Sequence, residues 1–403
     1  MAKIALMGYG VVGSGLIELI DNNKSKIDNL EVSSILVRCL SKHEGKKYSE
    51  YLTDNVEEFF SQESDIVVEV MGSLHPAYEY VKRALQAKKH VVTANKDLIA
   101  EYGGELLSLA KESGVTLKFE ASVGGGIPIL KPLIESLEGN SIKSIRGILN
   151  GTTNYILTKM YNENIDYEEA LKEAQALGFA EANPDSDVLG YDAARKLAIL
   201  STIAYKNRIS WKNINIEGIN NLERQDFIYA KELGYRIKLI AESIMEGDQV
   251  YASVRPALVK EGSILSTINN EVNGVVFHGD AVGEVSFTGK GAGMLPTGSA
   301  VFGDVLDIIR GRKETSENYL NEILVNRYID SEVGVLIRIK TEEKKSVIKK
   351  LRLEFPDLQL VGEKRDELAL YINTLGENKI QDALERLKLD GNIISFKKLL
   401  RAV

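Results

Sequence analysis

"IALMGYGVVGSG", Ile4 to Gly15, decides the fold of the N-terminal part of this chain. An apolar run of strand length leads into Gly8, Gly10 and Gly13, and a helical pattern follows. In such a setting the first glycine allows a tight turn, the second lets the backbone approach a pyrophosphate, and the third lets helix and strand pack closely. The stretch predicts a dinucleotide-binding turn at a helix N-terminus, with an unliganded glycine-rich turn as the alternative. The predicted contacts are Gly8, Tyr9, Gly10, Val11, Val12 and Gly13.

Strand-like and helix-like segments alternate from this turn to about residue 130. The strand-like runs are "KIALMGYG", "EVSSILV", "DIVVEVMG", "HVVTANK" and "VTLKFEASV", and amphipathic segments separate them. This order predicts a Rossmann-type α/β fold with a doubly wound parallel sheet, whose ligands bind at the carboxyl ends of the strands. Gly72, which ends "DIVVEVMG", is predicted to contact the cofactor with the first turn.

The pattern changes near Ile129. The long helices "IPILKPLIESL", "TTNYILTKMYN" and "YEEALKEAQALG" are predicted, and then the strands "GDQVYASVRPALV", "VNGVVFHGD" and "GEVSFTGKG". We therefore expect a second domain of the α+β class. The last segment has the order βαββαβ, a ferredoxin-like plan, after the polar linker "RGRKETSEN". The predicted domains are residues 1–130, completed by about 290–311, then 131–289 and 319–403.

Composition limits the class of protein. The 403 residues have a formal net charge of −8, which does not favour nucleic acid as a partner. No apolar run is long enough for a membrane span, and Cys39 is the single cysteine, so we expect a cytoplasmic protein without disulfides. The four histidines are far apart in the sequence, which argues against a zinc site.

The end of the second strand bears on cofactor choice. NAD-specific sites usually place an acidic residue there, but "SILVRCLSKHEGKK" has Arg38 and Lys42 instead. Positive charge at this position suits a 2′-phosphate, so NADP(H) is favoured over NAD(H). Charged residues exposed to solvent at a strand end are the alternative.

Two further strand ends have residues suited to chemistry. "HVVTANKDLIA" places Lys96 just past a strand, where an ammonium can polarise a carbonyl or bind a carboxylate. A surface lysine is the alternative. "FEASVGGGIPI" offers oxygen ligands to a monovalent cation, Na⁺ or K⁺, unless its glycines only provide backbone freedom. The predicted ligands are Glu120 and the carbonyls of Val123, Gly125 and Ile127.

"GFAEANPDSDVLGYDAARK" concentrates charge around a helix that is otherwise apolar. Asp192 and Lys196 are four residues apart and therefore share one helical face. Taken by themselves, Asp192 and Lys196 are consistent with a structural ion pair. The acidic residues upstream, including Glu181 and Asp187, favour instead a polar cavity for a substrate with an amino group. Lys196 could then exchange a proton with an alcohol or alkoxide.

In sequence order, six blocks of the chain resemble homoserine dehydrogenase from Met1 to about Gly311. They are "GYGVVGSG", "VVTANK", "FEASVGGGIP", "GILNGTTNYIL", "ALGFAEANPDSDVLGYDAARK" and "GKGAGMLPTGSAVFGD". The resemblance implies NAD(P)H-dependent reduction of aspartate 4-semialdehyde to homoserine, on the route to threonine and methionine. It also implies that the second domain, residues 131–289, is the substrate-binding and dimerisation domain, in a homodimer or homotetramer.

The resemblance assigns roles residue by residue. Lys196 corresponds to the proton donor and acceptor, and Lys96 to a lysine that reaches both cofactor and substrate. Glu181, Asp192 and Asp187 match the residues that bind substrate. The cation site named above also matches, and further cofactor contacts fall at Gly178, Gly291 and Gly293. Cys39 stands where the family usually has an acid, which strengthens the expectation of NADP(H).

The tail from Tyr319 to Val403 resembles the ACT domain that many members append. It lacks the usual Pro-Gly after the first strand, so binding of an effector such as threonine and a role in dimer packing alone both remain open. Two other functions also remain open for the whole chain. One is a non-catalytic metabolite sensor, which has no need of Lys96 and Lys196. The other is a different amino-acid dehydrogenase, which would lack the acid-rich block.

Overall fold

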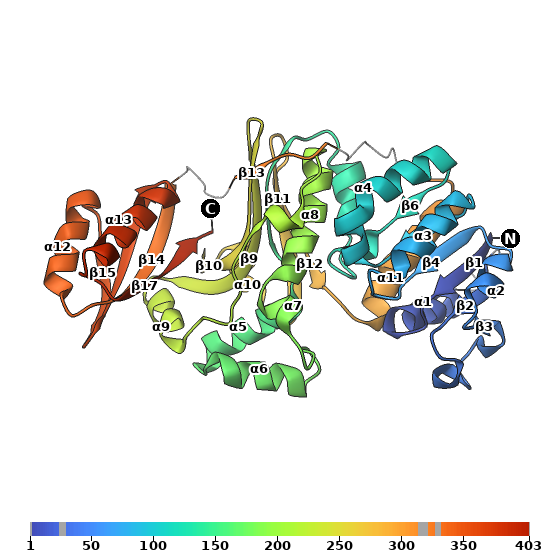
Figure 1. Ribbon diagram of the computed structural model, residues 1–403, viewed down its shortest axis with the longest axis horizontal. Helices are drawn as coiled ribbons and strands as arrows, with labels where there is room; N and C mark the ends of the chain where they lie inside the picture. Colours follow the sequence, from blue (N-terminus) through green and yellow to red (C-terminus); the bar gives the residue numbers. More distant parts are fainter. Residues whose placement is uncertain (1, 24–29, 313–320, 327–331, 403) are drawn as a thin grey trace. The chain divides into compact units, whose positions relative to one another are not determined.

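The computed structural model describes residues 2–23, 30–312, 321–326 and 332–402 (Figure 1). The chain divides into two compact units. The first unit consists of Met1–Ile145, Arg195–Asn213 and Asn273–Ile323, and the second of Arg146–Ala194, Ile214–Val272 and Leu324–Val403. Most of the predicted linker, from residue 313 on, and Tyr319 and Leu320 of the predicted tail lie outside the described residues.

The first unit contains the Rossmann-like sheet. Its order is β3-β2-β1-β4-β5-β6, and all neighbouring strands are parallel. The order reverses beside β1, which is the topological switch point where such sheets bind nucleotides. The predicted parallel sheet is thus confirmed. The strands are β1 (Ala2–Met7), β2 (Leu30–Leu36), β3 (Leu52–Thr53), β4 (Ile66–Glu69), β5 (His90–Thr93) and β6 (Leu117–Lys118).

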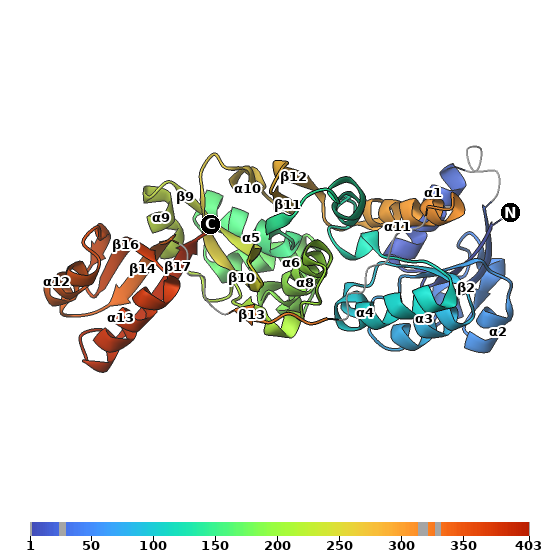
Figure 2. The same cartoon turned by 90° about the horizontal axis from the view of Figure 1, so that it is seen from above.

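Helices cover both faces of this sheet. Figure 2 shows α1 with α11 on one side and α3 with α4 on the other. α1 and α11 can approach closely because Gly15 and Gly298 lie at their contact: a Cβ on Gly15 would be 2.1 Å from the carbonyl oxygen of Met294. The helices are α1 (Val11–Asn22), α2 (Val56–Ser61), α3 (Ala77–Gln86), α4 (Lys96–Ser113) and α11 (Met294–Ile309).

Two elements near the end of this sheet are shorter than predicted. The strand expected in "VTLKFEASV" is only the two-residue β6, and a 3₁₀ turn at Glu120–Ser122 follows it. The long helix expected in "IPILKPLIESL" is a single π-helical turn, Pro132–Ser136. The chain turns back after β6 because the Glu120 carboxylate binds backbone amides at the start of the next segment. Pro132 has no amide proton to continue a regular helix.

The second unit is mixed α and β. β9 (Tyr235–Glu246) and β10 (Gln249–Lys260) form a long antiparallel hairpin. Its helices are α5 (Gly151–Glu163), α6 (Tyr167–Ala176), α7 (Asp185–Val188), α9 (Arg224–Glu232) and α10 (Ile264–Thr267). The short strands β8 (Asn215–Ile216) and β13 (Val325–Asn326) both pair with β10.

The division between the units passes through three elements. α8 (Tyr191–Tyr205) has Asp192 in the second unit and Lys196 in the first, and β7 (Ile142–Ile148) is divided in the same way. β11 (Val272–Gly279) and β12 (Gly283–Lys290), predicted from alternation, are neighbouring strands of the first unit, except that the first residue of β11 belongs to the second. Neither β7 nor β9 was predicted from the sequence. In β9 the reason is the burial of Lys238 and Glu242, whose charges interrupt the apolar pattern.

The C-terminal segment has the predicted order βαββαβ. Its four strands are antiparallel in the order β17-β14-β16-β15. β17 also pairs in parallel with β10, with Leu400 opposite Ala257, so this sheet continues the β9-β10 hairpin. The elements are β14 (Glu332–Lys340), α12 (Lys344–Glu354), β15 (Gln359–Lys364), β16 (Glu367–Leu375), α13 (Glu377–Leu389) and β17 (Ser395–Arg401). Within the described ranges, none of the helices is both long and apolar enough to cross a bilayer.

Candidate active site

The glycine-rich turn after β1 has the backbone geometry that a bound pyrophosphate requires. Gly8 has a φ of +102°, which favours glycine, and a Cβ on Gly13 would be 2.3 Å from the carbonyl oxygen of Gly8. A Cβ on Gly10 would meet no other described atom within 4 Å, so this residue borders open space. Gly10 is also the N-cap of α1 and provides no side-chain cap, which leaves the first amides for an anion.

A buried carboxylate joins the ends of β4 and β5. Glu69 is fully buried and accepts hydrogen bonds from the Met71 amide at 2.8 Å and the Thr93 hydroxyl at 2.6 Å. Burial raises the pKa of Glu69. These bonds fix the turn that contains Gly72. Glu69 was not predicted from the sequence, although an acidic residue inside the apolar run "DIVVEVMG" is a usable signal.

The same network positions the start of α4. The Asn95 amide donates to the Thr93 hydroxyl at 3.0 Å, and the Asn95 side chain donates to the Ser73 carbonyl at 2.7 Å. Asn95 also caps α4 by accepting a hydrogen bond from the Leu98 amide. Lys96, the first residue of α4, therefore begins the helix from a fixed point. Its side chain is half-buried.

An ion pair forms between two residues that are adjacent in sequence to the two predicted catalytic lysines. Arg195 Nε lies 3.0 Å from Asp97 Oδ1, and its guanidinium lies 4.5 Å from the centre of a Trp211 ring. Asp97 follows Lys96 in α4, and Arg195 precedes Lys196 in α8. The first unit thus brings together the helical turns that contain Lys96 and Lys196.

In the second unit one amide holds two of the predicted acids. Asn150 Nδ2 donates to Asp187 Oδ1 at 2.7 Å and to Asp192 Oδ2 at 2.9 Å, while its oxygen caps α5 by accepting from the Thr153 amide. Asp192 is buried and Asp187 half-buried. Asn150 thus holds two acidic side chains close together, an arrangement that could bind a cationic amino group. Asn150 was not predicted as a site residue, although the block "ILNGTTNYIL" contains it.

The remaining predicted residues are distributed over both units. Glu181 is exposed, and its carbonyl accepts a hydrogen bond from Gln175. Gly178 follows α6 with a φ of +76°. Arg38 is exposed beyond β2. Gly291 and Gly293 precede α11 in the first unit, where Gly291 packs against the predicted cation turn.

Glu120 makes contacts that the sequence did not predict. Its carboxylate accepts hydrogen bonds from the amides of Ile129 at 2.6 Å, Leu130 at 2.9 Å and Lys131 at 2.7 Å. It is therefore an anchor for the following turn, whatever else it binds. A Cβ on Gly125 would be 2.3 Å from the carbonyl oxygen of Gly291, so only glycine fits this turn. Val123 and Ile127, the other predicted ligands, are buried beside it.

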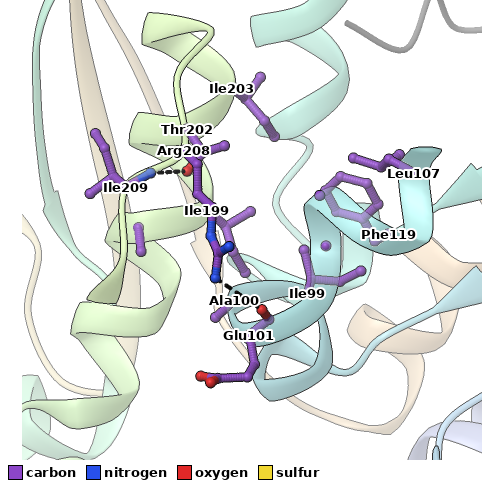
Figure 3. A pocket seen from close by; sticks show the side chains of 13 residues that line it. Ile99, Ala100, Glu101, Leu107, Phe119, Ile199, Thr202, Ile203, Arg208 and Ile209 are labelled. Carbon is purple, nitrogen blue, oxygen red and sulfur yellow. Dashed lines mark hydrogen bonds between the residues drawn. The ribbon is translucent and has the colours of Figure 1, made fainter. Parts of the chain in front are cut away.

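A small apolar pocket lies between α4 and α8 in the first unit (Figure 3). Ile99, Leu107, Phe119 and Ile199 line it, and Arg208 donates to the Glu101 carbonyl at its side. None of the predicted site residues lines this pocket, so it is separate from the catalytic groups proposed from the sequence.

Comparisons with known proteins point to one family. Residues 8–120 match a model for the homoserine dehydrogenase NAD-binding domain, and residues 128–306 match one for homoserine dehydrogenase. The Bacillus subtilis homoserine dehydrogenase is 43% identical over 318 residues, covering 77% of this chain and 73% of that protein. The Thiobacillus denitrificans homoserine dehydrogenase structure superposes with a TM-score of 0.91 at 33% identity, covering 100% of this chain and 98% of that one. A hyperthermophilic archaeal homoserine dehydrogenase in complex with NADPH gives a TM-score of 0.65 at 30% identity, covering 78% of this chain and 99% of that one.

Proposed function

The chain belongs to the homoserine dehydrogenase family, and from this premise we propose how its residues divide the work of the reaction. It is an oxidoreductase that acts on a CH–OH group and has a nucleotide-binding Rossmann-like domain. The reaction we assign is the reversible reduction of L-aspartate 4-semialdehyde to L-homoserine. The observation that carries the residue assignment is the Asn150 amide shared by Asp187 and Asp192.

We assign substrate binding to the acids and proton transfer to a lysine. When bound, the dinucleotide supplies the hydride that reduces the aldehyde carbon. Asp192 and Glu181 bind the amino end of the substrate, and Asp187 supports Asp192 through Asn150. Lys96 orients the substrate, and Lys196 gives a proton to the oxygen as it becomes an alkoxide. In the reverse direction Lys196 accepts that proton.

The cofactor in this proposal is NADP(H) rather than NAD(H). Arg38 and Lys42 follow β2, where NAD-specific sites usually have an acid. The archaeal relative in complex with NADPH supports the same choice. Gly8, Gly10 and the amides of Val11 and Val12 would hold the pyrophosphate, and Gly72, Gly178, Gly291 and Gly293 are further proposed contacts.

A monovalent cation, Na⁺ or K⁺, is part of the proposal. The ligands we propose are the Glu120 carboxylate, which the amides of Ile129, Leu130 and Lys131 hold in place, and the carbonyls of Val123, Gly125 and Ile127. This cation would hold the turn that packs against Gly291.

We further propose that residues 319–403 form an ACT-like module, and that 1–130 with 290–311 and 131–289 are the other domains. The order β17-β14-β16-β15 supports the module, because it is the ferredoxin-like arrangement. This module could have two roles. One is binding of an effector, with threonine as the first candidate, and the other is packing in a homodimer or homotetramer.

The test is a coupled set of rate measurements. NADPH absorbance is followed on mixing the protein with aspartate 4-semialdehyde, then with NADH in place of NADPH, and then with threonine added. We expect turnover, a higher kcat/KM with NADPH, and unchanged rates with threonine if the tail only packs. Nucleotide binding without turnover would favour a metabolite sensor instead.

A further inference from the structure

The pocket between α4 and α8 is an apolar hollow with a cationic group at its side (Figure 3). It contains about 430 Å³ of space that no atoms fill, its open mouth included. Every residue that lines it belongs to the first unit. Most of the lining side chains are hydrocarbon, namely Ile99, Leu107, Phe119, Ala198, Ile199 and Ile203. Such a surface suits the apolar body of a small ligand.

Two glycines inside α4 leave this side of the helix open. Gly103 and Gly104 both line the pocket, within a helix of 18 residues. Glycine is, after proline, the least favourable residue in a helix interior. A Cβ on Gly103 would lie only 3.2 Å from Cγ2 of Ile99, another residue of the lining. The space beside α4 is therefore kept at the expense of helix stability.

Arg208 brings a positive charge to the side of the pocket. Its backbone is fixed on both sides, because its amide donates to the Asn321 carbonyl at 2.7 Å and its carbonyl accepts from the Ile323 amide at 3.1 Å. Among the described residues its guanidinium makes one hydrogen bond, from Nη2 to the Glu101 carbonyl at 3.4 Å. A guanidinium has five N–H donors, so most of them can still bind an anion.

The carboxylate of Glu101, which also borders the pocket, is bound by other residues. Lys212 Nζ lies 2.6 Å from its Oε1, and Trp211 Nε1 donates to its Oε2 at 3.3 Å. The pKa of Glu101 is lowered first by Lys212, then by Trp211, and least by Arg208. Glu101 is the one acidic residue among the described residues of the lining. The pocket therefore favours an anionic ligand over a cationic one.

We propose that this pocket binds a small monocarboxylate with a branched apolar body. The carboxylate binds Arg208, since a guanidinium can donate two parallel hydrogen bonds to it, and the hydrocarbon lies between α4 and α8. Lys96 and Lys196 belong to the same two helices but do not line the pocket. A ligand here would therefore not compete with the nucleotide or with homoserine, and the inference stands apart from the proposed function.

Titration calorimetry with three probes tests the two parts of this site. The probes are 4-methylpentanoate, its neutral amide, and acetate, which has the charge without the apolar body. Wild type should bind 4-methylpentanoate at least about tenfold more tightly than either of the others, because the amide loses a charge-assisted contact and acetate loses about four buried carbons. NADP⁺ or homoserine, added separately, should change this affinity by less than about twofold. Equal binding of acid and amide, or competition by either addition, would overturn the inference.

Variants at two arginines locate the carboxylate. Arg208→Met should weaken 4-methylpentanoate at least about tenfold and the amide by less than about twofold, which would also show that the pocket is still formed. Arg310→Met, at the exposed end of α11, is the matched control and should change neither affinity by more than about twofold. Melting temperatures of both variants show whether they fold. An Arg208→Met protein that binds the acid as tightly as wild type would place the carboxylate elsewhere and overturn the assignment.

Discussion

Lys196 is the residue on which the proposed chemistry depends. Replacing it with Ala should reduce kcat by about 10² to 10⁴, the usual contribution of a positioned acid or base. Nucleotide affinity should stay within about twofold, because the dinucleotide turn is not altered. Steady-state rates and a fluorescence titration with NADPH measure the two quantities. Residual activity within about tenfold of wild type, or about 1.4 kcal/mol of barrier, contradicts a role in proton transfer.

Among single residues, Asp192 and Lys196 were proposed from the sequence because their charges interrupt an apolar helix. Lys96 stood out because it directly follows a strand. Asn150 did not, because asparagine is common at a helix N-cap and its second role needs two acids from a segment some 40 residues away. Glu69 does interrupt an apolar run, but its role could not be predicted, since its hydroxyl and amide donors come from β5 and the turn after β4.

At the scale of elements, Glu120 decides how the chain continues after β6. Glu120→Gln should lower the free energy of unfolding by about 1–3 kcal/mol, because an amide has one acceptor oxygen and its NH₂ group would face a backbone donor. Glu138→Gln, an exposed change in the same region, is the control and should have almost no effect. Urea unfolding of the three proteins measures this. Equal stabilities would show that the three amide contacts contribute little.

Glu120→Gln also tests whether Glu120 binds the proposed cation. At constant ionic strength, added Na⁺ or K⁺ should raise the melting temperature of wild type and not of Glu120→Gln, since a ligand stabilises only the state that binds it. An equal rise in both proteins would mean that the cation binds elsewhere.

The strand β9 contains a buried lysine that should make stability depend on pH. Lys238 Nζ donates to Asn154 Oδ1 at 2.9 Å and to the Ile268 carbonyl at 2.6 Å. Burial, with a smaller contribution from Arg236, lowers the pKa of Lys238 to about 7, against an ordinary value of 10.5. Between these values the unfolded chain binds more protons than the folded one, so stability should rise with pH from about 7 to 10.

Lys238→Met should remove this rise, which a single group can make as steep as about 1.4 kcal/mol per pH unit. Urea midpoints at pH 7, 8 and 9 measure it. Lys260→Met, at the exposed end of β10, should keep the wild-type slope. If the Lys238→Met slope matches wild type, the lysine is protonated throughout this range.

For the whole molecule, the sequence predicted the order of elements better than their partners. The Rossmann-like sheet and the βαββαβ order followed from local pattern, because strand and helix periods differ. The pairing of β17 with β10 could not be predicted, since it joins Leu400 to Ala257 and no local signal specifies a partner so distant. The C-terminal segment therefore shares a sheet with the rest of the second unit. Its ferredoxin-like order of elements did not suggest this.

A buried ion pair reinforces this connection. Arg255 Nη1 on β10 lies 2.9 Å from Glu377 Oε2 at the start of α13, and both side chains are buried. Burial alone would raise the pKa of Glu377, but Arg255 and then Lys398 lower it below its ordinary value. The pair should therefore stabilise the fold at neutral pH and lose that contribution as pH falls through the lowered pKa of Glu377.

Arg255→Ala should cost about 3–5 kcal/mol of unfolding free energy, because it leaves a buried carboxylate with Lys398 as its remaining close cation. The double variant Arg255→Met with Glu377→Met should cost less than Arg255→Ala, since neither charge is then buried alone. Arg365→Ala, in the exposed turn before β16, is the control. Turnover per folded molecule should stay within about twofold, because Arg255 contacts none of the proposed catalytic groups. An Arg255→Ala protein as stable as the control would mean that the C-terminal segment folds independently of β10.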